Sequence, residues 1–119
     1  MRNKAASRLD SGALRRVLRR FHADLVAAEQ IINDLNVFPV PDGDTGTNCV
    51  LTLQSGLPVL DKGRTALPTM LDGLAGALAL GARGNSGVIL AEYLRGWASL
   101  DGDGWGAEEL HAALAAGAT

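Results

Sequence analysis

Cysteine, aromatic residues and long apolar runs are all scarce in this sequence. Cys49 is the one cysteine among 119 residues, which excludes an internal disulfide and fits a reducing compartment, so we expect a cytoplasmic protein. Aromatic residues are 4% of the chain, too few for the stacking platforms that bind single-stranded nucleic acids. No apolar run approaches the roughly 20 residues of a membrane span. We therefore expect neither nucleic-acid binding nor membrane insertion.

The sequence also lacks a large excess of charge of either sign. The sequence has 11 basic and 13 acidic residues, for a formal net charge of −2. This balance gives no global electrostatic reason to bind nucleic acid or an acidic membrane. The first twenty residues are locally basic, but no apolar segment of the kind found in secretory signals follows them. The hydrophobic content of 47% is typical of one domain with a modest core.

Apolar residues recur at three- and four-residue spacing, which predicts helices. Residues 1–9 are predicted to be a flexible arm, and residues 10–119 one helical domain. Asp10 and Ser11 are the candidate N-caps of the first helix. No segment shows the alternation of a strand, so the sequence predicts an all-α fold. The expected helices are 11–35, 46–54, 67–80, 86–98 and 107–116, with Gly56 and Pro58 ending or kinking the second.

The segment VFPVPDGDTGTN, residues 37–48, concentrates polar and conformationally special residues before a predicted helix. Asp42 and Asp44 flank a glycine, so both carboxylates can turn towards one cation. Oxygen ligands of this kind favour Mg²⁺ or Ca²⁺ over zinc. The helix start that follows offers unpaired N–H groups and a partial positive charge, which suit phosphate. The predicted phosphate contacts from this segment are Thr45, Gly46, Thr47 and Asn48.

Other interpretations of this segment are less consistent with its residues. A capped turn needs one such polar residue and not five. A calcium loop needs further acidic ligands, where this chain has Cys49, Val50 and Leu51. A phosphatase-type aspartate would follow a buried parallel strand, which Pro39 and Pro41 disfavour. The segment therefore predicts a site for a metal ion and phosphate.

A second glycine-rich helix start occurs in GARGNSGVIL, residues 81–90. Asn85 or Ser86 can cap the helix, and the guanidinium of Arg83 can bind phosphate. The alternative is a tight turn between helices with a surface arginine. Neither segment matches the Gly-x-x-x-x-Gly-Lys-Ser/Thr pattern of a P-loop. We expect the two helix starts to converge on one polyphosphate, with Arg83, Asn85, Ser86 and Gly87 contributing from the second.

LNVFPVPDGDTGTN and GARGNSGVIL closely resemble the two signature segments of the ATP-binding domain of bacterial fatty acid kinase. That DAK2-type domain is related to the DhaL-type, nucleotide-binding domain of dihydroxyacetone kinases. The resemblance implies a barrel of antiparallel amphipathic helices, here a partial one because family domains are longer. It implies ATP or ADP held through Mg²⁺ ions at one end. It assigns Asp42 and Asp44 as metal ligands at the catalytic centre, with Asn36 near the position of a third aspartate.

The resemblance also implies an activity. In fatty acid kinase a lipid-binding partner protein presents a fatty acid, whose carboxylate is phosphorylated to an acyl phosphate. This chain would then be the ATP·Mg²⁺-binding domain of a similar phosphotransferase. The alternative is a non-catalytic nucleotide-binding module, or an inactive remnant of a dihydroxyacetone kinase-like domain. A partial barrel would expose an apolar inner face, so a homo-oligomer is a further expectation.

Overall fold

The structure, a computed structural model, describes residues 8–35, 43–62, 65–100, 102 and 104–118. These residues form helices and, apart from one bridged residue pair, no β-structure, which confirms the predicted all-α class. The helices are α1 (Ser11–Asp34), α2 (Thr45–Gln54), α3 (Leu57–Leu60), α4 (Leu67–Gly81), α5 (Gly84–Trp97) and α6 (Ala107–Ala118).

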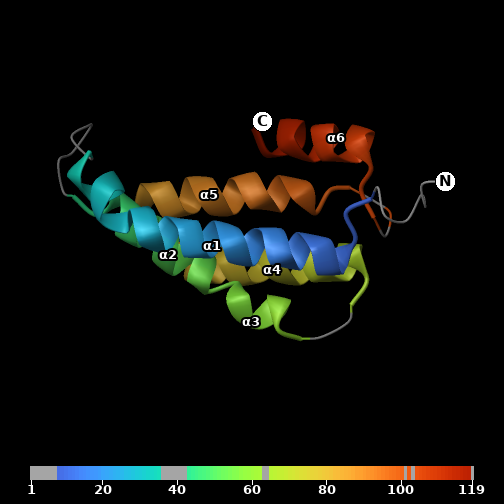
Figure 1. Ribbon diagram of the computed structural model, residues 1–119, viewed down its shortest axis with the longest axis horizontal. Helices are drawn as coiled ribbons and strands as arrows, with labels where there is room; N and C mark the ends of the chain where they lie inside the picture. Colours follow the sequence, from blue (N-terminus) through green and yellow to red (C-terminus); the bar gives the residue numbers. More distant parts are fainter. Residues whose placement is uncertain (1–7, 36–42, 63–64, 101, 103, 119) are drawn as a thin grey trace.

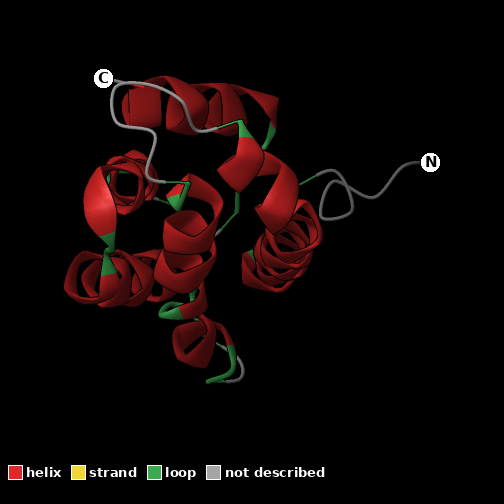
Figure 2. Ribbon diagram, turned by 90° about the vertical axis from the view of Figure 1, so that its left-hand side faces the viewer, coloured by secondary structure: helices red, strands yellow, loops and turns green. Residues whose placement is uncertain are grey.

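The helices lie roughly along the long axis of a molecule that measures 52 × 26 × 26 Å (Figure 1). Helices α1, α4 and α6 run in one direction, and α2 and α5 run in the other. Helix α1 contacts α2, α5 lies between α4 and α6, and α2 also contacts α5. The end-on view shows α6 as a separate layer on top of the other helices (Figure 2). The sequential pairs α1–α2, α4–α5 and α5–α6 are antiparallel, whereas α2 and α5 are parallel.

Helix α1 starts where the sequence predicts. The carboxylate of Asp10 accepts a hydrogen bond from the N–H of Ala13 at 2.8 Å, which caps the first turn. Leu14 and Leu18 are buried, but other members of the apolar stripe are not: Leu35 is 72% exposed and Val17 is 48% exposed. The stripe is therefore wider than the surface that the neighbouring described helices cover.

The centre of the core is α4, whose apolar residues lie at three- and four-residue spacing. Pro68 occupies its first turn, where a missing N–H costs no helical hydrogen bond. Leu53 of α2 and Leu94 of α5 belong to the same buried cluster. The fully buried residues of α4 are Leu67, Met70, Leu71, Leu74 and Leu78.

The interruption predicted after α2 is present. Helix α2 ends at Gln54, and the single turn α3 carries Pro58 near its start. Gly56 lies directly against α4, since a Cβ built there would be 2.6 Å from a methyl carbon of Leu74. A larger residue at position 56 would push α4 away, so glycine permits the chain to turn close to the core.

The predicted N-terminal arm differs from the structure at its last two residues. Leu9 and Trp105 exchange both backbone hydrogen bonds, at 2.7 and 2.8 Å. The guanidinium of Arg8 donates to the carbonyl of Gly104 and lies 3.6 Å from the carboxylate of Glu109. Residues 8 and 9 are thus attached to the start of α6, while residues 1–7 lie outside the described part of the chain. Within that part, no helix is both long and apolar enough to cross a membrane.

Candidate nucleotide site at the starts of α2 and α5

Asp44 is the residue from which α2 begins. Its carbonyl accepts the first helical hydrogen bond, from the N–H of Asn48 at 2.8 Å. Its carboxylate is exposed and does not cap the helix, unlike that of Asp10 at the start of α1. A carboxylate at this position lies next to the positive end of the helix. Its oxygens are of the ligand type that Mg²⁺ prefers. The other predicted metal ligands, Asp42 and Asn36, lie outside the described residues.

Thr47, in the first turn of α2, is hydrogen-bonded to two residues of α1. Its hydroxyl donates to the carboxylate of Glu29 at 2.7 Å and accepts from the side-chain amide of Asn33 at 3.0 Å. Its backbone N–H donates to the side-chain oxygen of Asn33 at 3.1 Å. These half-buried contacts join the last turns of α1 to the first turn of α2. We call Glu29, Asn33 and Thr47 the α1–α2 clamp.

Gly46 is buried at the closest approach of α1 and α2. A Cβ at this position would lie 2.5 Å from the backbone oxygen of Glu29 and 3.1 Å from the Cβ of Ile32. Its Cα therefore faces α1, and the two helices could not approach this closely with a larger residue. The sequence predicts Gly46 as a phosphate contact, but the described contacts already require a glycine here for helix packing. Thr45, just before it, is half-buried.

The start of α5 is held by α2. The backbone N–H of Arg83, the residue that precedes α5, donates to the hydroxyl of Thr52 at 3.0 Å. Thr52 is completely buried. Gly87, one turn into α5, lies over the same hydroxyl, since a Cβ there would be 2.3 Å from it. One threonine of α2 therefore fixes where α5 begins.

The two signature segments meet at Asn48 and Gly84. A Cβ on Gly84 would lie 2.4 Å from the side-chain nitrogen of Asn48, and the φ of Gly84 is +67°, so both space and backbone conformation require glycine. Because α2 and α5 are parallel, both begin at the same end of the molecule (Figure 1). The structure thus brings together the two helix starts that the sequence predicts to converge. Their dipoles place partial positive charge at this end.

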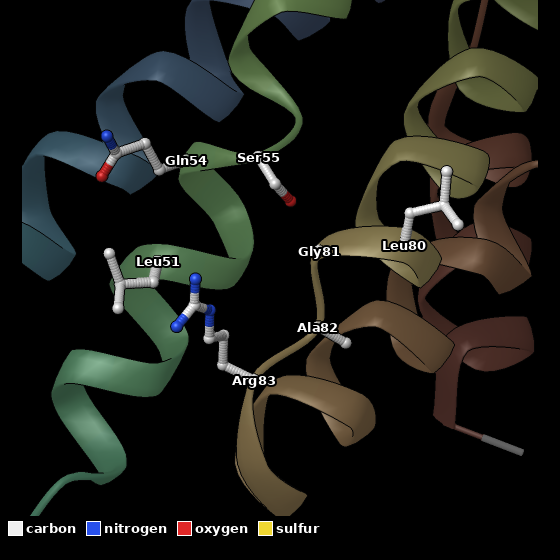
Figure 3. Close-up of a pocket in the computed structure, with 7 residues that line it drawn as sticks. All are labelled: Leu51, Gln54, Ser55, Leu80, Gly81, Ala82 and Arg83. Atoms are coloured by element: carbon white, nitrogen blue, oxygen red, sulfur yellow. The ribbon is translucent and has the colours of Figure 1, made fainter.

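The remaining predicted residues of the second segment lie around the start of α5. Asn85 is exposed and Ser86 is half-buried, both in the first turn. The side chain of Arg83 lies beside Leu51 of α2 and lines a hollow of about 360 Å³ (Figure 3). The hollow lies between the C-terminal half of α2 and the α4–α5 connection, and its other lining residues are Gln54, Ser55, Leu80, Gly81 and Ala82.

The described residues contain no group of three His, Cys, Asp or Glu side chains that could hold a metal by themselves. Asp44 is the described member of the predicted acidic pair. The fit to Mg²⁺ therefore rests on an exposed carboxylate at the start of a helix, a donor of the right chemistry that helix capping does not use.

Sequence reasoning missed Glu29, Asn33 and Thr52. A signal for the first two was present, because Glu29 and Asn33 are four positions apart and so share a face of α1, and the apolar residue Ile32 lies three positions after Glu29 on that side. Polar residues on the packed face of an amphipathic helix indicate a specific partner. Thr52 carried no such signal, since threonine is more often exposed than buried.

Much of the chain is similar to known proteins. A family model described as the DAK2 domain matches residues 39–119. An uncharacterized protein of Staphylococcus saprophyticus is 46% identical over 77 residues, which are 64% of this chain and 13% of that protein. Protein YloV of Bacillus subtilis is 48% identical over 67 residues, 56% of this chain and 12% of YloV. The match thus spans about an eighth of these relatives. With most of its length matched by the family model, the chain belongs to the DAK2 domain family, which is related to kinases.

Proposed function

We propose that this chain is the ATP·Mg²⁺-binding domain of a phosphotransferase similar to fatty acid kinase. The observation that carries the proposal is the contact between Asn48 and Gly84, which places two glycine-rich helix starts side by side. Two such starts offer N–H donors and positive dipole ends to one polyphosphate. The DAK2 match and the resemblance of both segments to a nucleotide site support this assignment.

Each group has a role in this proposal. Asp42 and Asp44, and by resemblance Asn36, hold Mg²⁺, which neutralises charge on the phosphates when bound. Asn48 and the first turn of α5, with Asn85, Ser86 and Gly87, orient the phosphate chain. Arg83 adds a positive charge at the edge of the site. Phosphoryl transfer of this kind depends on positioning and charge, so no covalent nucleophile is needed.

The proposal also names the acceptor of the phosphoryl group. By resemblance it is a fatty acid carboxylate presented by a lipid-binding partner protein, and the product is an acyl phosphate. The matched segment is about an eighth of the curated relatives, so the proposal assigns no acceptor contact to this chain. Binding of nucleotide without transfer is the alternative function, and formation of acyl phosphate with a lipid-loaded partner distinguishes the two.

The site is tested by calorimetry with ATP and ADP at increasing Mg²⁺. Asp42→Asn combined with Asp44→Asn should abolish Mg²⁺-dependent binding, because two carboxylates are lost. Asp61→Asn combined with Asp72→Asn, both exposed and outside the two signature segments, is the matched control and should bind like the parent. Parental affinity in the Asp42/Asp44 variant would refute the assignment. A thermal shift with ATP, ADP and AMP provides the second readout, and stabilisation should require both metal and a polyphosphate.

A further inference from the structure

Thr47 has no hydrogen-bond donor left for a ligand. A threonine hydroxyl has one O–H, and here it donates to Glu29. The backbone N–H of Thr47 donates to Asn33. A phosphate oxygen only accepts hydrogen bonds, so it cannot replace either partner without breaking the α1–α2 clamp. The contacts of this residue are therefore those of a structural support and not of a phosphate ligand.

We propose that Thr47 is a positioning residue, which fixes the start of α2 against α1 through Glu29 and Asn33 so that other groups can bind the nucleotide. This inference rests on the proposed function and changes the role of one predicted phosphate contact. The clamp makes three hydrogen bonds, one of them to a carboxylate, and such charge-assisted bonds are stronger than neutral ones.

The clamp controls more than α2. Asn48 follows Thr47 directly and lies against Gly84, so a shift of α2's first turn also changes its contact with the start of α5. Displacement of binding groups by about 1 Å is enough to impair a preorganised site. Gly46, also at this turn, lets the two helices approach closely enough for the clamp bonds to form. The clamp thus sets the relative position of both helix starts.

A double-mutant cycle on nucleotide affinity tests this role. The proteins are the parent, Thr47→Val, Glu29→Ala and the double variant, each titrated with Mg²⁺-ADP in a calorimeter. Each single change should weaken binding roughly tenfold, and the double variant should be no weaker than the worse single one, because both remove the same interaction. Thr47→Ser keeps the hydroxyl and should bind within about twofold of the parent. Thr69→Val and Glu108→Ala, both exposed, are the matched controls.

Three results would overturn the inference. If Thr47 were a phosphate ligand, Glu29→Ala would bind like the parent, or the two losses would multiply in the double variant. If the clamp only supported folding, both single variants would melt at lower temperature yet bind with parental affinity. Should Glu29→Ala not fold, Glu29→Gln keeps the volume of the side chain and replaces it in the cycle. Absence of binding by the parent is a different outcome, since it refutes the proposed function itself.

Discussion

At one end of the molecule the helices meet through hydrogen-bonded polar side chains, and at the other end they meet through aromatic rings. The site end contains the α1–α2 clamp and the hydrogen bond from Arg83 to Thr52. The far end contains Trp97, whose ring packs edge-on against Tyr93 at 5.9 Å and against Trp105 at 5.7 Å between centroids. Three of the five aromatic residues are thus packed together at the far end, and Phe38, in the first signature segment, lies outside the described residues.

The difference has a physical consequence. Aromatic packing stabilises mainly through the large apolar area that it buries, whereas a hydrogen bond weakens steeply when its distance or angle changes. The far end therefore contributes mainly free energy of folding, and the site end contributes defined positions. Changes at the two ends should separate these effects: at the far end stability falls without a change in ligand affinity, and at the site end both change.

The largest effect on stability is expected at Trp105, which is 1% exposed. Trp105→Ala removes the contact with Trp97 and leaves a cavity, so the free energy of unfolding should fall by about 3–5 kcal/mol. Nucleotide affinity of the folded protein should stay at the parental value. Denaturant unfolding and calorimetry measure the two quantities.

Trp105→Phe is the control for this change. It keeps an aromatic ring, and the indole N–H that it removes has no hydrogen-bond partner among the described residues. Its loss of stability should therefore be clearly smaller. A Trp105→Ala protein with parental stability, or one with weakened nucleotide binding, would break the distinction between the two ends.

An intermediate effect is expected at Gly46. Gly46→Ala forces a methyl group against the carbonyl of Glu29, and such overpacking typically costs about 1–3 kcal/mol. Because the methyl group separates α1 from α2 at the clamp, Mg²⁺-ADP affinity should fall as well. The same two measurements apply as for Trp105.

Gly76 is the matched control, since a Cβ there would meet no atom within 4 Å. Gly76→Ala lies inside α4 and should stabilise the protein by up to about 1 kcal/mol, because alanine favours a helix. Nucleotide affinity should not change. Equal responses at positions 46 and 76 would mean that the close approach of α1 and α2 does not determine the effect.

The same contrast explains what could be predicted from the sequence. Helix positions follow from local patterns, so the Asp10 cap and the bounds of α4 were predictable from spacing and propensity. The pairing of Leu9 with Trp105 joins residues 96 positions apart, and no local pattern encodes it. Its residues were accordingly predicted as an arm and a loop.

For the candidate site, the sequence predicted the two helix starts and their convergence. It did not predict how they are fixed, because Glu29 and Thr52 act through contacts across helices. Thr47 is the instructive case. Its residue type and position suit a phosphate ligand, and only its partners on α1 show that both donors are already in use.

The smallest effect is expected at an exposed pair on α5, Glu92 and Arg95, which lies in the same turns as Tyr93 and Trp97 but faces solvent. The hydrogen bond from Arg95, and secondarily its charge, hold the pKa of the Glu92 carboxyl below its ordinary value. A lowered pKa in the folded state means that the pair stabilises the protein when Glu92 is ionised, and that this contribution disappears as the pH falls through the lowered pKa.

Glu92→Gln should therefore lower the melting temperature slightly at neutral pH and not in strong acid. In an Arg95→Gln background the difference should be absent at every pH. Because both side chains are solvated, added salt should also reduce it. A large loss of stability, or any loss of nucleotide affinity, would show that this surface is coupled to one of the two ends after all.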